Sequence, residues 1–197
     1  MCSGEAVRLA LKKLKITRKK TKKYIERNEA VRSEFLQAIA EIPAELVVYV
    51  DECGVDKDMN REYGRAPRGE PVYSQTRGRK FERVNVIAGK CQNKIVAPGL
   101  YKGYTDHRLF EAWFSGALLT QVKPGSVIVL DNATFHRKKT LHKLAALAGC
   151  SVLFLPPYSP DLNPVEKLWA NLKNFLKFYL RYFNSLDLAF REFFQLD

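Results

Sequence analysis

The sequence lacks several features that would place the protein in other classes. No apolar run approaches the roughly 18 residues that a membrane-spanning helix needs, and the N-terminus has no apolar segment typical of a signal peptide. The four cysteines are far apart and form no C-x-x-C pair: Cys2, Cys53, Cys91 and Cys150. This spacing argues against a zinc knuckle and against a disulfide framework. We therefore expect an intracellular protein in a reducing compartment, with no membrane partner.

Acidic residues are absent from one long segment near the N-terminus. Between Arg8 and Lys23 there are nine Lys or Arg residues and no Asp or Glu, in a chain whose formal net charge is +12. Basic runs are often solvated surface, but this density favours a polyanionic partner, and nucleic acid is the natural candidate. We expect these side chains of the segment to contact DNA: Lys12, Lys13, Arg18, Lys19, Lys20, Lys22 and Lys23.

The remaining sequence has enough apolar residues for one well-buried domain. In a chain of 197 residues, 46% are hydrophobic, so a core can form. Helical spacing is seen at 5–16, 24–41, 106–122, 137–149, 164–182 and 186–195. Strand-like apolar runs lie at 45–52, 83–90, 94–103, 125–136 and 151–157, and a stretch rich in Gly, Pro and Arg at 59–80 predicts loops around short edge strands. Three strands followed by alternating helices and strands predict an α/β fold with a mixed sheet. We expect a basic helical segment and linker over 1–42 and the α/β domain over 43–197.

Two buried strands are each followed by an aspartate. Asp51 closes "VVYVD" and Asp131 closes "VIVLD". One aspartate at a strand end is commonly a turn former or a helix cap. Two of them, together with Glu166, suit a cluster that holds hard divalent cations such as Mg²⁺, because burying unpaired carboxylates is costly. A pair of such ions stabilises the attacking and leaving oxygens in phosphodiester chemistry.

Glu166 follows a proline-rich run, "LPPYSPDLNPVEKLW", at residues 155–169. The prolines make a stiff, non-helical path out of the preceding strand. Asn163 then resembles an N-cap with Pro164 at the first helical position, which puts Glu166 in the first turn, where the helix dipole favours a carboxylate. The alternative is that Glu166 completes a capping box by bonding back to Asn163.

The blocks "VYVDECGVD", "VLDNATFH" and "LPPYSPDLNPVEKLW" together resemble the catalytic region of bacterial insertion-sequence transposases of the Tc/mariner superfamily. The 34 residues between Asp131 and Glu166 match the interval in that group. The resemblance implies an RNase H-like fold, with a mixed sheet flanked by helices as in retroviral integrases. It identifies Asp51, Asp131 and Glu166 as the catalytic, metal-binding DDE triad.

The same resemblance implies two Mg²⁺ or Mn²⁺ ions, cleavage of double-stranded DNA at transposon ends, and strand transfer of the 3′-hydroxyl into target DNA at TA. It also implies a homodimer on DNA. Together with the reducing compartment expected from the cysteines, DNA as the partner places the protein in the cytoplasm, associated with the nucleoid. Family members carry N-terminal helix-turn-helix domains, of which this chain has only a resembling last helix and basic linker. A DNA-binding remnant without catalysis and an RNase H-like nuclease that only hydrolyses therefore stay open.

Several other residues are candidates for supporting roles. Asn132, His136 and Asn163 are placed to contact the substrate or to orient an acid, although a structural histidine is the simpler role for His136. Glu52 should point to the opposite sheet face. Asp161 is the rival for the third acid, and we reject it because it precedes the helix.

Lys173 and Lys177 share a helix face with Glu166, which predicts either a DNA contact or an ordinary solvated face. A further basic cluster predicted along the DNA path comprises Arg77, Arg79 and Lys80. The apolar stripe of the same helix comprises Val165, Leu168, Trp169, Leu172, Leu176 and Tyr179.

Overall fold

The computed structural model describes residues 3–16, 24–56, 70–71, 73, 83–183 and 185–196. Apart from residues 70, 71 and 73, the predicted loops and edge strands of 59–80 lie outside this part of the chain. None of the helices in these ranges combines the length and the apolar character needed to span a membrane.

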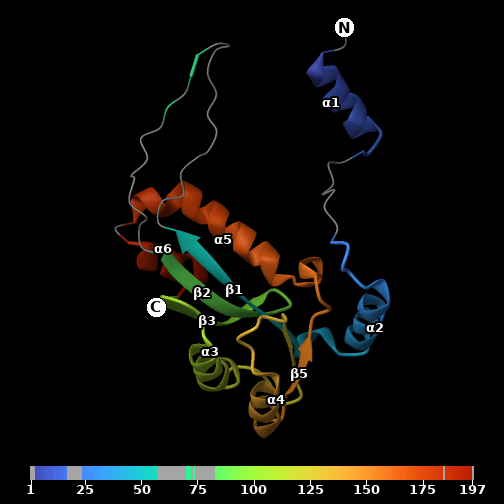
Figure 1. The fold of residues 1–197 in the computed structure, drawn as a ribbon. Helices are drawn as coiled ribbons and strands as arrows, with labels where there is room; N and C mark the ends of the chain where they lie inside the picture. The colour runs from blue at the N-terminus through green and yellow to red at the C-terminus, as the bar shows by residue number, and fades with distance from the viewer. Residues whose placement is uncertain are drawn as a thin grey trace.

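A single mixed sheet of five strands forms the centre of the fold (Figure 1). The strands are β1 (Val47–Asp56), β2 (Arg83–Cys91), β3 (Lys94–Lys102), β4 (Val127–Leu130) and β5 (Ser151–Phe154). Their spatial order is β3-β2-β1-β4-β5. β1, β2 and β3 pair antiparallel, whereas β4 and β5 run parallel to β1. The predicted mixed sheet is therefore confirmed, with its parallel half built from the β-branched runs that the sequence marks as buried.

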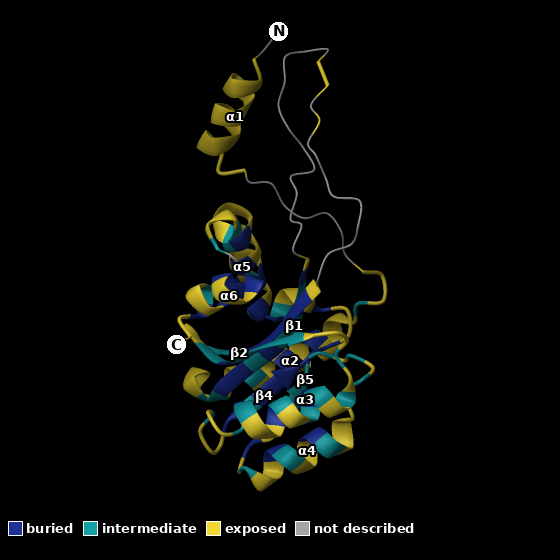
Figure 2. Ribbon diagram, turned by 90° about the vertical axis from the view of Figure 1, so that its left-hand side faces the viewer, coloured by how far each residue is buried: buried dark blue, intermediate teal, exposed yellow. Residues whose placement is uncertain are grey.

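Helices cover both faces of the sheet in a three-layer arrangement (Figure 2). The helices are α1 (Gly4–Lys13), α2 (Glu29–Ala40), α3 (His107–Trp113), α4 (Lys138–Leu147), α5 (Val165–Tyr179) and α6 (Leu186–Phe194). Short helical turns lie at Ala44–Leu46, Pro160–Leu162 and Leu180–Tyr182, and a π-helical turn at Phe114–Leu118 extends α3. Helices α5 and α6 lie on one face, and α3 and α4 lie on the other (Figure 2). No residue of α1 is buried.

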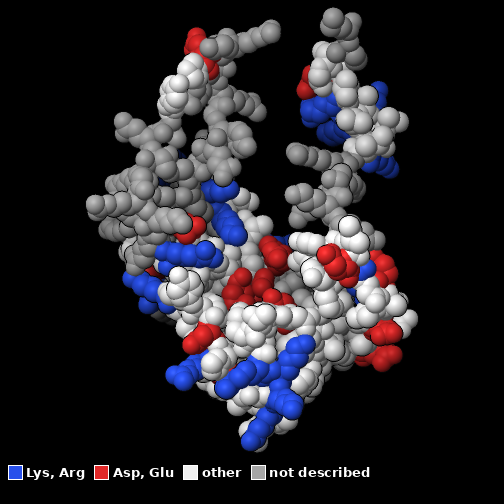
Figure 3. Space-filling view, viewed as in Figure 1, with Lys and Arg blue, Asp and Glu red and all other residues white. Residues whose placement is uncertain are grey.

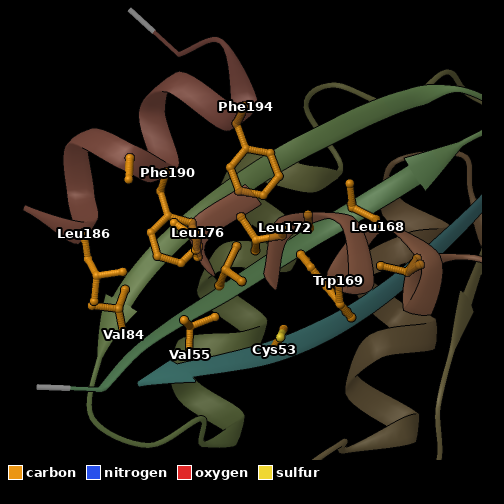
Figure 4. Close-up of a cluster of buried hydrophobic side chains, with 14 residues drawn as sticks. Cys53, Val55, Val84, Leu168, Trp169, Leu172, Leu176, Leu186, Phe190 and Phe194 are labelled. Atoms are coloured by element: carbon orange, nitrogen blue, oxygen red, sulfur yellow. The ribbon is translucent and has the colours of Figure 1, made fainter. Parts of the chain in front are cut away.

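The core on the α5 side is a continuous apolar cluster between β1, β2, α5 and α6 (Figure 4). Leu172 and Leu176 of α5 and Phe190 of α6 are almost fully inaccessible to solvent. The predicted α5 stripe is confirmed for Val165, Leu168, Trp169, Leu172 and Leu176, which are all buried. It is wrong for Tyr179, which is 51% exposed at the end of the helix, where its ring stacks on the partly buried Phe175 at the edge of the cluster.

A second cluster fills the opposite face, where Phe110, Phe114 and Leu141 of the α3–α4 layer pack on the sheet. A third, smaller cluster lies against α2. It joins Phe35 of α2 to Val47 at the start of β1 and to Val129 and Leu155 at the C-terminal ends of β4 and β5. The fold thus brings the N-terminal half of β1 into contact with two separate helical layers.

Element bounds differ from the predicted ones at several places. Strand β1 continues to Asp56, so the expectation that Asp51 ends it is wrong. The reason is that β1 pairs with β2 along Tyr49–Asp56, whereas β4 pairs with β1 only over Val127–Val129. The strand predicted at 125–136 is correspondingly short, and helix α2 begins at Glu29 rather than at residue 24, with Asn28 as its N-cap.

Candidate active site

Two of the three predicted acids lie next to each other because β1 and β4 are parallel neighbours. Tyr49 pairs with Val129 in this ladder. Two further residues along each strand place Asp51 opposite Asp131, on the same sheet face, because side chains alternate with a period of two. β4 ends at Leu130 while β1 continues, so Asp131 lies just beyond the last strand pairing. The predicted aspartate pair is therefore created by the strand register.

Asp51 is the more buried of the two aspartates, and a side chain of α5 is hydrogen-bonded to it. Its Oδ2 accepts a hydrogen bond from Nε1 of Trp169 at 2.9 Å. Burial is the main cause that raises the pKa of Asp51, and the nearby charges of Glu166 and Asp131 add to it, while the Trp169 bond lowers it; together they give a pKa of about 7. The surroundings of Asp51 therefore disfavour its charged form.

Asp131 has the opposite electrostatic character. Its Oδ1 accepts hydrogen bonds from His136 Nε2 at 3.0 Å and from the Ala133 backbone N–H at 3.0 Å. Burial alone raises the pKa of Asp131, but these two bonds and the charge of His136 outweigh it, so the pKa is lowered. His136 is itself 7% exposed, and its ring lies 4.3 Å from the ring of Phe110 and 4.4 Å from that of Phe135, centroid to centroid. The aromatic pair fixes the imidazole so that it orients the carboxylate.

Glu166 stands in the first turn of α5, as predicted. The helix begins at Val165, and Pro164 already has helical dihedral angles. The Asn163 side chain caps it, because its Oδ1 accepts a hydrogen bond from the Val165 N–H at 3.1 Å. The Asn163 N–H donates to the Pro160 carbonyl, so the capping-box alternative for Glu166 is not adopted. Within the described ranges, no hydrogen bond or ion pair occupies the exposed Glu166 carboxylate.

The three acids are arranged with Asp51 in the middle. Both Glu166 and Asp131 act on the charge of Asp51. Figure 3 shows acidic side chains gathered in a hollow on this face, bordered by Lys and Arg side chains. Among the residues that the structure describes, no three Asp, Glu, His or Cys side chains lie close enough together to hold a single ion. The arrangement is therefore two neighbouring acid pairs that share Asp51.

Glu52 lies on the opposite sheet face from Asp51, as expected for the next residue of a continuing strand. Val48 and Val50, which point to the same face of β1 as Glu52, belong to the core beneath α3 and α4. Burial, and to a smaller extent the charges of Asp51 and Asp131, raise the pKa of Glu52 to about 8. Glu52 is thus a fourth acid behind the site, turned away from α5.

The other predicted side chains have mixed placements. Asn132 ties the end of β4 to that of β5, because its Nδ2 donates to the Leu155 carbonyl at 2.5 Å and its Oδ1 accepts from Lys138 Nζ at 2.7 Å. Asn163 also donates from Nδ2 to the Val50 carbonyl at 3.5 Å, which links α5 to β1 one residue before Asp51. Both asparagines therefore hold acid-bearing segments in place.

The predicted DNA-contacting lysines divide into two groups. Lys173 lies near Cys53 and the acids, because its positive charge offsets part of the burial that raises the pKa of the Cys53 thiol, on which Asp51 and Glu166 also act. Lys177 is exposed one turn further along α5, and Lys12 and Lys13 are exposed in the last turn of α1. The remaining predicted contacts lie outside the described residues: Arg18, Lys19, Lys20, Lys22, Lys23, Arg77, Arg79 and Lys80.

The sequence reasoning missed the polar role of Trp169. It assigned this residue to the apolar stripe of α5, where its ring does pack. The available signal was its spacing, because a residue three positions after Glu166 shares a helix face with it.

The site is an open hollow, whereas a cavity of about 480 Å³ lies elsewhere, along α6, lined by Leu188 and Arg191 among others. An open acidic hollow suits a polymer better than an enclosed small molecule.

Residues 46–187 match the family described as "DDE superfamily endonuclease". Among curated proteins, the chain is 30% identical over 91 residues to "Uncharacterized protein y4pE/y4sA" of Sinorhizobium fredii (strain NBRC 101917 / NGR234), covering 45% of this chain and 64% of that protein.

Solved structures of Mos1 transposase have a similar fold. The paired-end complex with the left transposon end gives a TM-score of 0.65 at 18% identity, covering 98% of this chain and 63% of that one. The strand transfer complex gives 0.62 at 20% identity, covering 86% and 55%. The chain therefore spans about three fifths of the proteins that it matches. The similarity, including a TM-score of 0.60 to the Mos1 catalytic domain, confirms the predicted RNase H-like fold.

Proposed function

Because the chain belongs to the DDE superfamily endonucleases, we propose that it is the catalytic part of a DNA transposase of the Tc/mariner type. It cleaves DNA at the ends of a mobile element and transfers the freed 3′-hydroxyl to target DNA. The observation that carries this proposal is the position of Asp51 between two further carboxylates, Asp131 and Glu166, at the surface of the sheet.

The donor set of this site fits hard divalent cations, Mg²⁺ or Mn²⁺. All three groups are carboxylates, the ligands that such ions prefer. Burial, more than the neighbouring acids, raises the pKa of Asp51, and a bound cation would favour its charged form. Because Asp51 is shared by two acid pairs, we assign one ion to Asp51 and Asp131 and a second to Asp51 and Glu166. Structures of Mos1 paired-end complexes with Mn and with Mg support this choice of metal. When bound, two such ions stabilise both the attacking and the leaving oxygen of a phosphodiester.

The residues around the acids prepare them for these ions. Trp169 and His136 each donate a hydrogen bond to one aspartate and leave its other oxygen for a ligand. Glu166 needs no such donor, because the proline-rich run and the Asn163 cap fix where its helix begins. Supporting contacts of this kind are what hold a metal ligand in its productive orientation.

The proposed partner is double-stranded DNA, as transposon ends and as target. Support comes from the Lys and Arg side chains that border the acidic hollow (Figure 3) and from the Mos1 structures, which include a complex with the left transposon end. Lys173 is positioned to hold a phosphate next to the acids. We further propose that the protein acts as a homodimer on paired ends, targets TA, and is associated with the nucleoid.

The test is nicking of supercoiled plasmid in Mg²⁺ or Mn²⁺ by the purified protein and by Asp131→Asn. We expect the variant to lose at least about 1,000-fold in nicking rate while DNA binding in a filter or mobility assay stays unchanged. The control is Asp187→Asn, which removes an exposed acid on α6 and should leave nicking intact.

Three outcomes would contradict the proposal. Nicking that survives Asp131→Asn would show that the acids are not the catalytic centre. Nicking without any joining of a supplied 3′-hydroxyl end to target DNA would identify a nuclease that only hydrolyses. Binding of DNA without metal-dependent nicking by the parent protein would favour a DNA-binding remnant.

A further inference from the structure

Helix α2 carries a buried arginine whose partner is a distant acid. Arg32 is 5% exposed. Its Nη1 and Nη2 donate to Oδ1 and Oδ2 of Asp161 at 3.1 and 2.8 Å. A two-pronged pair of this kind fixes both position and orientation, which a single point charge does not. Asp161, which the sequence offers as an alternative third acid, is therefore paired with Arg32 and does not belong to the acid cluster.

Asp161 lies on the short path that leads to Glu166. It belongs to the helical turn Pro160–Leu162, which the Asn163 N–H closes by donating to the Pro160 carbonyl at 2.9 Å. Asn163 in turn caps α5 and bonds to the Val50 carbonyl of β1. Between Asp161 and Glu166 the backbone thus has little freedom, so a shift of Asp161 is transmitted to the start of α5.

The apolar side of α2 contacts the other acid-bearing elements. Phe35 is 6% exposed and packs in one cluster with Val47, Val129 and Leu155, with Tyr49 and Leu162 against its edge. Tyr49 and Val129 each stand two residues before an aspartate of the site, and Leu162 stands four before Glu166. One helix therefore touches the approach to all three acids. The family match begins at residue 46, so this helix lies outside it.

We propose that α2 is part of the catalytic unit and that Arg32 is a positioning residue, which sets the location of Glu166 through Asp161. This inference rests on the proposed function, since it concerns the same three acids. It also moves the start of the catalytic unit ahead of residue 43, where the sequence places it.

The test compares Arg32→Gln, Asp161→Asn and the double variant in the full chain. The first readout is the Mn²⁺ concentration for half-maximal nicking, measured at saturating plasmid so that lost DNA affinity does not contribute. We expect this midpoint to rise about 10-fold or more in each single variant, the usual range for the loss of a group that orients a metal ligand. The double variant should lose less than the two single losses combined, because each single variant already removes the Arg32–Asp161 pair; Asp161 also pairs with Arg27 at 3.7 Å and Arg32 with Glu29 at 3.4 Å.

Two further variants separate positioning from folding. Asp161→Asn changes a side chain that is 52% exposed, so the chain should fold, which the thermal unfolding midpoint verifies. Arg32→Lys retains charge but not the two-pronged geometry, and should recover only part of the loss. The matched control Asp187→Asn breaks an exposed ion pair on α6 and should leave the Mn²⁺ midpoint unchanged.

A second readout distinguishes failure of the inference from failure of the proposed function. Mn²⁺ binding by the protein alone, followed by calorimetry or by the Mn²⁺ spin signal, requires no catalysis. If the parent protein binds Mn²⁺ and the Arg32→Gln and Asp161→Asn variants bind it equally well with an unchanged nicking midpoint, α2 does not position the site. Additive losses in the double variant would overturn the inference too. If the parent neither binds Mn²⁺ nor nicks DNA, the proposed function itself has failed.

Discussion

Asp51 and Asp131 occupy equivalent places on adjacent parallel strands, but the protein treats them differently. Trp169 gives Asp51 one neutral donor in a buried setting next to two acids, and its pKa is raised to about 7. His136 and a backbone N–H both donate to Asp131, and its pKa is lowered. The surroundings of Asp131 thus favour its charged form, whereas those of Asp51 disfavour it. The comparison shows that the β1–β4 register brings the two aspartates together, and that the segments that donate hydrogen bonds to each aspartate determine the direction of its pKa shift.

Among the residues that support the two aspartates, the largest expected effect comes from removing His136, which supports Asp131. His136→Ala deletes a donor and leaves a void beside Phe110 and Phe135. We expect a loss of about 2–4 kcal/mol in unfolding free energy and about 10- to 100-fold in nicking, measured by chemical denaturation and by the plasmid assay.

His136→Gln is the informative partner of that variant, because its amide N–H can still donate to Asp131. It should recover more of the activity than of the stability. Equal recovery of both would mean that the imidazole acts as core packing and not as the donor that orients Asp131.

A smaller effect is expected from Trp169→Phe, which keeps the ring in the α5 core and deletes the indole donor to Asp51. The lost bond stabilises the ionised carboxylate, so the pKa of Asp51 should rise above its present value of about 7. The pH at which nicking reaches half its maximum should move upward, with a loss of about 10-fold or less at pH 7. An unchanged pH profile would show that the bond to Trp169 is without consequence.

The smallest effect concerns stability and pH in the absence of DNA. The folded pKa of Asp51 lies at about 7, above its ordinary value of 3.8. Between these two values the folded chain binds more protons than the unfolded one, so the unfolding free energy decreases as pH rises. Glu52 acts in the same direction up to about pH 8. Asp131, with a lowered pKa, contributes stability above its ordinary pKa that is lost in acid.

Metal should counteract this loss at alkaline pH only. At ten times its Kd, a bound ion adds about 1.4 kcal/mol, which corresponds to a rise of about 3–6 °C in Tm for a chain of this size. We expect Mg²⁺ to raise Tm by this amount at pH 8 and by much less at pH 5.5, as scanning calorimetry can measure. A shift of the same size in Asp51→Asn would place the ion elsewhere.

The sequence predicts the mixed sheet and the meeting of Asp51 with Asp131 because both depend on local patterns. Buried β-branched runs mark the strands, and parallel neighbours bring their ends to one sheet edge. The continuation of β1 past Asp51 depends instead on pairing with β2, a distant partner, so the sequence alone suggests an earlier end. The proline-rich run predicts the start of α5 to within one residue, since proline and the Asn163 cap act locally.

Contacts between remote segments have no such local signal. Trp169 reads as one more member of an apolar stripe, and its indole N–H finds Asp51 only once α5 has packed on β1. Arg32 reads as an ordinary charged residue of an amphipathic helix, and Asp161 as a turn former. Their pairing becomes visible only when α2 docks beside the end of β5.

The contacts that complete the acidic hollow have a consequence for the protein during its synthesis. Asn163 bonds to Val50 across 113 positions, Trp169 to Asp51 across 118, and Arg32 to Asp161 across 129. At about 5–20 residues per second, a ribosome takes roughly 6–26 s to add the last of these intervals. A nascent or prematurely terminated chain that ends before Glu166 contains Asp51 and Asp131 but lacks the two α5 residues of the site, Glu166 and Trp169. The acidic hollow is therefore completed only after α5 has been synthesised, because Trp169 follows Asp51 by 118 positions.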